Sequence, residues 1–392
     1  MVLNRTPMGW NSWNTFGENI NEEVVLQTAD YIVESGLKDC GYEYVIIDDC
    51  WSLRERGENG EIIPDPVKFP HGMKYLADYI HSKGLKFGMY SCAGTMTCAG
   101  YPGSMGYEFI DAACFARWEI DYLKYDFCYH PETEEGHVLY KRMALALKTS
   151  GRDIALAACS WGSENTRTWI KETGADTFRS TGDINDSWPS IKGLALSQFR
   201  VAEYNGKGCF NDMDMLIVGM KGKGNVAVTG CTDDEYRTHF AIWAFMGSPL
   251  IIGCDLRKID DENLKTLKNK MLIDIARDEA YRQPFSLKGR KQYRQNRGVD
   301  DPLLDWYEES CPVMARFLDN GDIAIGAFNL TDGDYHFGAT LQDIGLGNTT
   351  GKTLELTDCW TGEKSYPLND TICRTLKPHC SVVFRARVID KK

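Results

Sequence analysis

The chain has 392 residues, of which 43% are hydrophobic and 26% charged, so it is long enough for one large domain followed by a smaller one. Its formal net charge of -12 and sequence pI near 5.2 argue against a nucleic-acid partner and an anionic membrane surface, because both attract basic proteins. We therefore expect a neutral small molecule as the substrate.

Signals for targeting and for metal binding are weak along the chain. No run reaches the roughly 20 consecutive apolar residues that a membrane helix requires, and Met1 to Pro7 lacks the apolar core of a secretory signal. We expect a cytoplasmic protein, with secretion after removal of a leader as the open alternative. The 14 cysteines are scattered and include no Cys-x-x-Cys pair, so we interpret most as free thiols and expect no metal site.

Up to about residue 280, short apolar segments alternate with stretches of helical period, which is the rhythm of βα units that build a parallel sheet. In one such stretch Met73, Leu76, Ala77 and Ile80 fall on one helical face. Eight units predict an α/β fold, a (β/α)8 TIM barrel over residues 1–285. The predicted strands cover residues 8–13, 43–48, 86–91, 122–126, 154–159, 177–180, 209–214 and 249–252.

From about residue 285 the pattern changes to short strands separated by turn residues. The strongest hairpin signal is Asn320-Gly321 between two apolar runs. Residues 286–392 are therefore predicted to form an antiparallel β-sandwich domain. Its expected strands are Leu303–Tyr307, Val313–Phe317, Asp322–Leu330, Thr353–Leu356 and Ser381–Ala386.

Acidic residues collect where the predicted barrel strands end, which is the edge at which barrel active sites form. They are Asp48 and Asp49 after the second strand, Asp126 after the fourth, Asp183 after the sixth and Asp214 after the seventh. Tryptophans accompany them, and this combination suits a pyranose, because carboxylates bind hydroxyls while an indole covers the apolar face of the ring. An aspartate after a strand is also a common helix cap, and we assign the segment Asp186 to Pro189 to that simpler role.

Cleavage of a glycosidic bond requires two carboxyl groups, one to protonate the leaving oxygen and one to attack the sugar or activate water. A neighbouring cation keeps a nucleophile ionised, whereas the acid/base needs a raised pKa. Asp126 shares its strand with Lys124 and is therefore the better nucleophile.

Several strand-end motifs resemble glycoside hydrolase family 27, the family of α-galactosidases and α-N-acetylgalactosaminidases. The resemblance runs in order along nearly the whole chain. The motifs are Pro7 to Trp13, Asp48 to Trp51, Thr97 to Ser104, Lys124 to Cys128 and Asn211 to Leu216.

The resemblance implies a barrel followed by a β-sandwich, retention of anomeric configuration, and no metal or organic cofactor. It implies Asp126 as the nucleophile and Asp183, four residues after Arg179, as the acid/base, with their carboxyl groups about 5–5.5 Å apart. The implied sugar contacts come from the residues that follow. They are Asp48 and Asp49 at the 4- and 6-hydroxyls, Lys124 at the 3-hydroxyl region, Arg179 on the side of the 2-position, Asp214 supporting the ring, and Trp13, Tyr90 and Met215 as walls.

Cysteines add a further implication and a departure from the family pattern. Cys98 and Cys128 match a pair that is disulfide-bonded in relatives, whereas Cys50 lacks its usual partner because Glu18 stands near that position. The missing bridge favours a reducing compartment, and this leaves open whether Cys98 and Cys128 are joined.

Substrate identity is the main alternative that the sequence leaves open. Many galactosidases of the family carry Glu at the position of Ser160, and α-N-acetylgalactosaminidases resemble Ser there. Cys159, Ser160, Trp161 and Ser163 are expected to border the 2-substituent of the sugar. We favour an exo-acting α-galactosidase, with α-N-acetylgalactosamine or β-L-arabinopyranose as alternative sugars.

Two readings from other classes are weaker: a catalytically silent carbohydrate-binding protein and a metal-dependent barrel enzyme using Asp48, Asp49 and Asp214 as ligands. A galactoside or oligosaccharide is the expected small-molecule partner, with neither nucleic acid nor membrane. The oligomeric state stays open between a monomer and a homodimer.

Overall fold

A computed structural model describes residues 3–287 and 310–391. Eight parallel strands pair in the order β7-β6-β5-β4-β3-β2-β1-β8. β7 and β8 are joined through Leu216, whose N–H donates to the Ile251 oxygen at 2.7 Å and whose oxygen accepts from Gly253 N at 2.8 Å. The predicted (β/α)8 barrel is confirmed. Its strands are β1 (Met8–Asn11), β2 (Tyr44–Ile46), β3 (Lys86–Cys92), β4 (Tyr122–Asp126), β5 (Ala155–Cys159), β6 (Thr177–Arg179), β7 (Phe210–Asp212) and β8 (Leu250–Ile252).

Helices cover the outside of the barrel with apolar faces turned inward, and in α3 the side chains of Met73, Leu76, Ala77 and Ile80 are all buried, as predicted. No helix among the described residues is both long and apolar enough to cross a membrane. The α-helices are α1 (Trp13–Phe16), α2 (Glu22–Glu34), α3 (Gly72–Ser82), α4 (Glu108–Arg117), α5 (Gly136–Thr149), α6 (Trp188–Phe199), α7 (Asp233–Met246), α8 (Asp261–Leu267) and α9 (Lys270–Ala276).

Short 3₁₀ helices replace an α-helix after β5, where the sequence predicted a helical segment. Trp161, Gly162, Glu164 and Asn165 all have positive φ there, a conformation that cannot continue into an α-helix. The 3₁₀ helices of the described chain are Gly17–Asn19, Lys38–Cys40, Ser163–Thr168, Ile170–Glu172, Ala202–Tyr204, Leu256–Lys258, Leu341–Ile344 and Asn348–Thr350.

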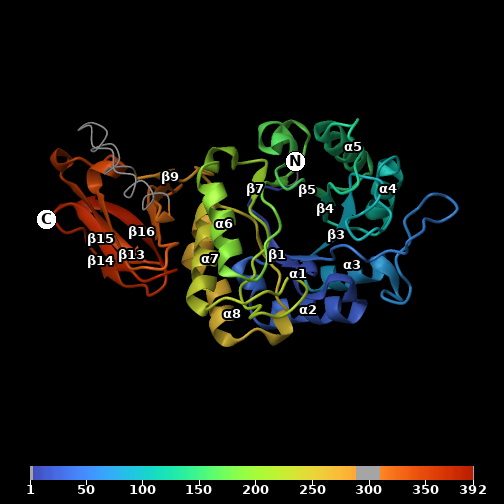
Figure 1. The fold of residues 1–392 in the computed structure, drawn as a ribbon, viewed down its shortest axis with the longest axis horizontal. Helices are drawn as coiled ribbons and strands as arrows, with labels where there is room; N and C mark the ends of the chain where they lie inside the picture. Colours follow the sequence, from blue (N-terminus) through green and yellow to red (C-terminus); the bar gives the residue numbers. More distant parts are fainter. Residues whose placement is uncertain (1–2, 288–309, 392) are drawn as a thin grey trace.

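Helix α7 lies between the barrel and the C-terminal domain (Figure 1), and its side chains from Tyr236 to Met246 are almost all buried. It begins with a capping box formed by Thr232 and Glu235 and ends at Gly247 in the left-handed conformation. On one side, Thr238 Oγ1 donates to the His379 oxygen of the C-terminal domain at 2.7 Å. The helix therefore packs the two domains against each other.

The C-terminal domain has a six-stranded antiparallel sheet, ordered β14-β13-β16-β11-β10-β9, and a separate β12-β15 pair. Apolar side chains of both sheets, including Phe337, Leu354 and Phe384, form one core, which confirms the predicted sandwich. The strands are β9 (Phe285–Ser286), β10 (Val313–Phe317), β11 (Ile323–Phe328), β12 (Tyr335–Thr340), β13 (Lys352–Asp358), β14 (Lys364–Ser365), β15 (Thr371–Leu376) and β16 (Ser381–Asp390).

The Asn320-Gly321 hairpin joins β10 to β11 as predicted, with Gly321 at a φ of 84°. The expected strand Leu303–Tyr307 lies outside the described residues. The predicted boundary after residue 285 stays a prediction; β9 already pairs with β10 of the second domain.

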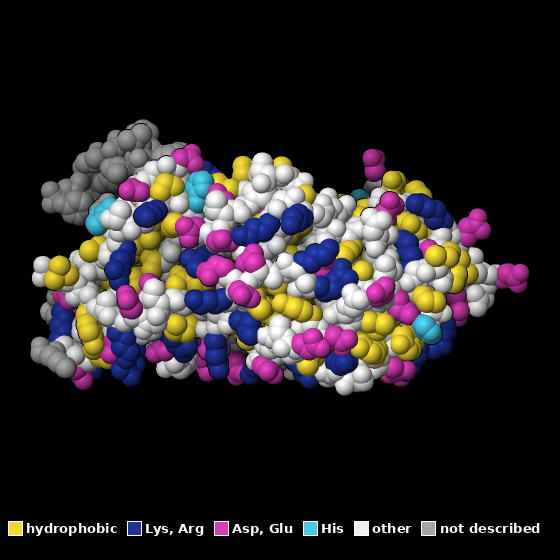
Figure 2. All heavy atoms as spheres, turned by 90° about the horizontal axis from the view of Figure 1, so that it is seen from below, with side chains coloured by type: hydrophobic (Ala, Val, Ile, Leu, Met, Phe, Trp, Pro, Cys, Tyr) yellow, Lys and Arg dark blue, Asp and Glu magenta, His cyan; other side chains and the backbone are white. Residues whose placement is uncertain are grey.

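Lysines, arginines and acids alternate over the face of the molecule drawn in Figure 2.

Gly193 lies exposed in the middle of α6, and a methyl group built there meets no atom within 4 Å. We expect Gly193→Ala to raise the free energy of unfolding by about 0.5–1 kcal/mol, because alanine loses less backbone entropy in a helix. Urea unfolding followed by circular dichroism measures the change. Gly247→Ala is the contrast, since Gly247 has a φ of 71° and should lose stability; a destabilised Gly193→Ala protein would contradict the expectation.

Candidate active site

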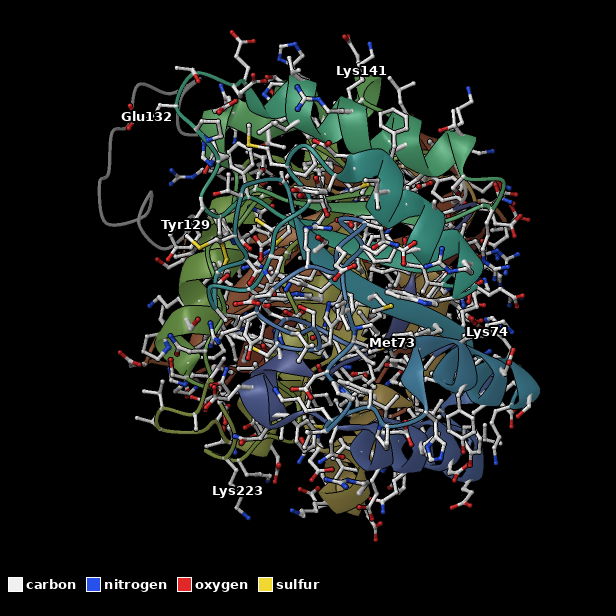
Figure 3. All side chains as sticks on the ribbon, turned by 90° about the vertical axis from the view of Figure 1, so that its right-hand side faces the viewer. Met73, Lys74, Tyr129, Glu132, Lys141 and Lys223 are labelled. Atoms are coloured by element: carbon white, nitrogen blue, oxygen red, sulfur yellow. A yellow bond between two sulfur atoms is a disulfide. The ribbon has the colours of Figure 1, made fainter. Side chains whose placement is uncertain are left out.

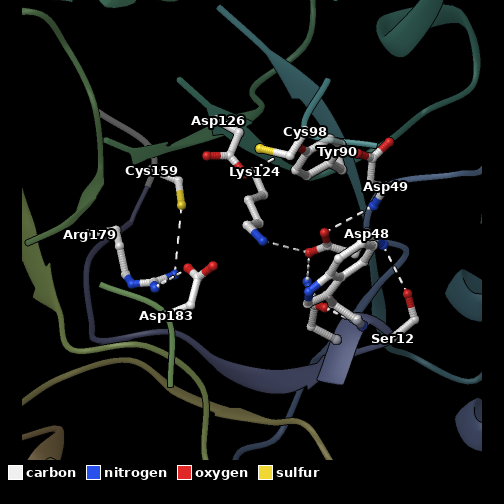
Figure 4. Close-up of polar contacts among 12 residues, drawn as sticks. Ser12, Asp48, Asp49, Tyr90, Cys98, Lys124, Asp126, Cys159, Arg179 and Asp183 are labelled. Atoms are coloured by element: carbon white, nitrogen blue, oxygen red, sulfur yellow. Dashed lines mark hydrogen bonds and ion pairs between the residues drawn. The ribbon is translucent and has the colours of Figure 1, made fainter. Parts of the chain in front are cut away.

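The acids predicted at the strand ends meet at the carboxyl-terminal mouth of the barrel. β4 ends at Asp126, which is in register with Cys159 on β5, and Cys159 is in register with Arg179 on β6. Neighbouring strands lie about 4.8 Å apart, so these three residues form a continuous row. Figure 4 shows the side chains of Asp126, Lys124, Cys159 and Asp183 converging on one space.

Asp126, the predicted nucleophile, is only 5% exposed. Its Oδ2 accepts from the Tyr90 hydroxyl at 3.0 Å, and its Oδ1 accepts from Phe127 N at 3.0 Å. Burial raises the pKa of Asp126 to about 6, although Lys124 opposes the shift. A neighbouring cation was expected from the sequence to keep the nucleophile ionised. In the structure, burial raises the pKa of Asp126 more than Lys124 lowers it, because the carboxyl has lost its water.

Lys124 extends from the middle of β4 toward Asp48, and the ammonium lies 2.8 Å from Asp48 Oδ2. Asn11 Nδ2 donates to the same oxygen at 2.7 Å. Burial alone would lower the pKa of Lys124, but Asp48 and Asp126 raise it well above its usual value, so the side chain stays charged. An ammonium has three N–H donors, and those that Asp48 does not take can bind sugar hydroxyls.

Arg179, at the end of β6, is 4% exposed and holds several groups at once. Its Nη2 donates to Asp183 Oδ1 at 2.7 Å, and its Nη1 forms an ion pair with Asp214 Oδ1 at 2.9 Å. The Asp183 side chain is 76% exposed, in contrast to Asp126. The predicted acid/base thus has one carboxylate oxygen held by a buried cation, while most of its side chain is open to solvent.

Asp49 was predicted to bind a hydroxyl, and in the structure its carboxylate already accepts several hydrogen bonds. Oδ1 accepts from Cys50 N at 2.7 Å and Oδ2 from Ala99 N at 3.0 Å. Burial raises the pKa of Asp49, and these backbone donors oppose the shift. Asp49 therefore also anchors the loop that carries Cys98.

Cys98 and Cys128 form a disulfide, which answers the question that the sequence left open. The bridge lies beside Tyr129 (Figure 3). Both sulfurs lie within 4.8 Å of a carboxylate oxygen of Asp126. This group of potential metal ligands does not provide thiolates, because the two sulfurs are bonded to each other. The other 12 cysteines are free, as expected for most of them.

The segment expected at the 2-position of the sugar divides into two environments. The Cys159 sulfur faces the site and lies 3.8 Å from Arg179 Nη1. Ser160 is fully buried, and its hydroxyl pairs with that of Thr166. Trp161 is partly buried and Ser163 is exposed. Ser160 thus packs into its own loop, whereas Cys159 borders the row between Asp126 and Arg179.

A cavity of about 30 Å³ lies inside the barrel, where charged groups of the mouth and apolar strand residues line it together. Met215 lines this cavity, and Trp13 packs partly buried in the same cluster of apolar side chains. The full lining consists of Asn11, Ile46, Tyr122, Lys124, Ala157, Ala158, Cys159, Arg179, Asp212, Asp214, Met215 and Ile251.

Asp212 is a member of the site that was not selected from the sequence. It ends β7 beside Arg179, and burial raises its pKa to about 6 while Arg179 opposes the shift. Its position at a strand end, two residues before Asp214, was the available signal. Asn11 and Ser12 were missed in the same way; Ser12 Oγ accepts from Asp48 N at 3.0 Å.

Comparison with known proteins gives matches along both domains. Residues 5–278 match the family model described as alpha galactosidase A, and residues 308–386 match that of the alpha galactosidase C-terminal beta sandwich domain. Alpha-galactosidase 3 of Arabidopsis thaliana is 47% identical over 305 residues, which are 78% of this chain and 66% of that protein.

Two further relatives are similar over nearly the whole chain. The alpha-galactosidase of Cyamopsis tetragonoloba is 39% identical over 94% of this chain and 84% of its own length. The structure of the Saccharomyces cerevisiae enzyme with raffinose superimposes with a TM-score of 0.85, at 28% identity and 98% coverage of both chains. The chain belongs to the alpha galactosidase A family, with the C-terminal β-sandwich of that family following its barrel.

Proposed function

We propose that this protein is a retaining exo-α-galactosidase that removes terminal α-D-galactosyl residues from galactosides and short oligosaccharides. The observation that carries the proposal is the pair of carboxyl groups at one barrel mouth, Asp126 buried beside Lys124 and Asp183 held by Arg179. Family membership and relatives named as alpha-galactosidases support the sugar and the bond.

In the first step the Asp126 carboxylate attacks C1 of the galactosyl group while Asp183 donates its proton to the glycosidic oxygen. The C1–O bond breaks, the aglycone leaves as an alcohol, and the sugar becomes bound to Asp126 as an ester. In the second step Asp183 takes a proton from water, the water oxygen attacks C1, and the Asp126 carboxylate is released. Two inversions at C1 retain the α configuration.

The charged groups supply the sugar contacts in this proposal. Asp48 and Lys124 form one ion-paired unit that offers both an acceptor and donors to neighbouring hydroxyls. The axial 4-hydroxyl of galactose can donate a hydrogen bond to a carboxylate acceptor in the site. Glucose has an equatorial 4-hydroxyl and would leave that acceptor without a hydrogen bond, so the site distinguishes the two sugars. Tyr90, Trp13 and Met215 serve as the walls of the pocket.

A wall beside the nucleophile, built from two packed loops, supports the removal of a terminal sugar. Residues 93–103 pack against residues 127–130, with Thr95 N donating to the Tyr129 oxygen at 3.2 Å and the Cys98–Cys128 disulfide crossing between them. Gly94 allows this approach, because a side chain there would overlap the Cys128 carbonyl and Tyr129.

Cytoplasmic location stays a prediction: the 12 free thiols, of which nine are buried, favour it, whereas the Cys98–Cys128 disulfide favours an oxidising compartment. Monomer and homodimer remain alternatives for the assembly.

We expect p-nitrophenyl α-galactoside to be hydrolysed with a higher kcat/KM than the α-N-acetylgalactosaminide or the β-L-arabinopyranoside, and Asp126→Asn to lose at least about a thousandfold of the activity on all three. Initial rates of nitrophenol release measure both. Calorimetry measures the binding of the product galactose to Asp126→Asn and so checks that the variant is folded. If the galactoside is the poorest of the three substrates, the sugar assignment is wrong; retained turnover in Asp126→Asn would remove the mechanism.

We expect kcat/KM to fall tenfold per pH unit below about pH 6, because Asp126 must be ionised to attack and burial raises its pKa to about 6. Asp212 titrates in the same range. A pH–rate profile of Asp212→Asn shows which carboxyl causes the fall in kcat/KM at low pH. The fall stays near pH 6 if Asp126 causes it, and shifts to another pH if Asp212 does.

The free energy of unfolding should change with pH in the opposite direction to kcat/KM, decreasing as the pH rises from about 4 to 6. Asp126 and Asp212 bind protons more tightly in the folded protein than at their ordinary pKa of 3.8, so the folded state holds more protons between about pH 4 and 6. Their contribution to stability is therefore complete below about pH 4 and is lost as the pH rises through about 6.

We expect Gly94→Ala to lower kcat/KM by about a hundredfold, because separation of the two loops displaces Cys128 and the neighbouring nucleophile. Steady-state kinetics with the aryl galactoside measure the loss. Gly193→Ala is the matched control and should keep its activity, since Gly193 lies on an open helix surface. Equal activity of the two variants would mean that the wall does not position Asp126.

A further inference from the structure

Asp214 adopts a backbone conformation that is unusual for a residue with a side chain, with φ at 82° in a position only 5% exposed. Such conformations persist only where the surroundings enforce them, and they concentrate at functional sites. The family resemblance implied that Asp214 supports the sugar ring, a role that does not by itself require this conformation.

Four hydrogen bonds or ion pairs fix Asp214. Its N–H donates to Asp212 Oδ1 at 2.9 Å, and its carbonyl accepts from Trp243 Nε1 at 2.7 Å. Its Oδ1 pairs with Arg179 Nη1 at 2.9 Å, and its Oδ2 accepts from Ile184 N at 2.7 Å. The first two contacts set the backbone, and the last two are made by the carboxylate that this backbone directs.

Both carboxylate contacts of Asp214 lead to Asp183. Ile184 directly follows Asp183 in the chain, so its anchored N–H sets where the Asp183 backbone lies. Arg179 connects to the Asp183 side chain through Nη2 at 2.7 Å. From the solvent side the loop receives little support, since Gly182 is exposed and a methyl group built there would meet nothing within 4 Å.

We propose that Asp214 is the positioning residue for the acid/base Asp183, and that Asp212 holds Asp214 in the conformation this requires. The proposal rests on the proposed function, because it assigns the role through Asp183. It places Asp212 and Asp214 in the proton-transfer step, apart from the nucleophile.

Proton transfer from Asp183 matters most when the leaving group is a poor one. As the C1–O bond breaks, the sugar oxygen of an oligosaccharide leaves as an alcohol and needs the proton of Asp183. A dinitrophenolate is stable as an anion and leaves without it. A displaced acid/base therefore lowers the rate with raffinose far more than the rate with 2,4-dinitrophenyl α-galactoside.

The experiment compares kcat/KM for these two substrates in Asp212→Ala, Asp212→Asn and Asp214→Asn. In Asp212→Ala we expect a loss of about a hundredfold or more with raffinose and of less than about tenfold with the dinitrophenyl substrate. Asp212→Asn keeps an oxygen that can accept from Asp214 N, so it should restore most of the raffinose activity. Asp214→Asn should show the same selective loss, because it removes the charge opposite Arg179.

Three reference variants make the result decisive. Asp183→Ala should show the selective loss in full, and Asp126→Asn should lose both substrates alike. Asp176→Ala is the matched control: Asp176 is a buried aspartate at the opposite end of β6, where it accepts from Leu3 N and Leu156 N. It should lower stability without changing the ratio between the substrates.

Equal loss of both substrates in Asp212→Ala and Asp214→Asn, in protein whose circular dichroism matches the parent, would overturn the proposal. So would a raffinose loss in Asp212→Asn as large as that in Asp212→Ala. If the parent protein hydrolyses neither galactoside, the proposed function fails, and that outcome is distinct from a parent that is active and variants that do not discriminate.

Discussion

A buried guanidinium at the end of β6 organises the catalytic mouth of this barrel. Arg179 is nearly inaccessible to water, yet it reaches Asp183, Asp214, Thr181 and the sulfur of Cys159. Burying a charge is costly unless it is paired and hydrogen-bonded, and these acceptors together provide that compensation. Removing the cation would leave Asp214 as a buried negative charge and would release the exposed Asp183 from its anchor.

The second cation, Lys124, has the matching role on the other side of the row. It forms an ion pair with Asp48, to which Asn11 also donates a hydrogen bond, and its positive charge acts to lower the pKa of Asp126. The site thus has two charge clusters, one around each predicted catalytic carboxyl group, with Cys159 between them. The nucleophile Asp126 is itself buried, whereas the side chain of the acid/base Asp183 is largely exposed to solvent.

Each end of each barrel strand was predicted to within two residues, because a strand buried on both faces is a continuous apolar run. Strand-end acids could be located for the same reason. β9, β12, β14 and β15 were not predicted; half of the side chains of β15 are exposed and give no apolar alternation. The 3₁₀ segment after β5 depends on positive φ at Trp161, Glu164 and Asn165, and these backbone conformations could not be predicted from the residue types.

Within the site, residue types were predictable and their partners were not. Asp126 and Arg179 could be selected from position alone, but the pKa of Asp126 depends on how completely the folded chain excludes water. The hydroxyl of Ser160 turns to Thr166 and the carboxylate of Asp212 to Asp214, contacts that arise from loop geometry.

Helix α7 connects the C-terminal domain to the residues that support the acid/base. Trp243 on that helix donates to the carbonyl of Asp214, and Thr238, five residues earlier, donates to the C-terminal domain. A barrel separated from its sandwich would expose one side of this helix to water and weaken the support behind Asp214. A chain in which another domain replaced the sandwich would therefore have to preserve the packing against α7 for the barrel to keep its acid/base in place.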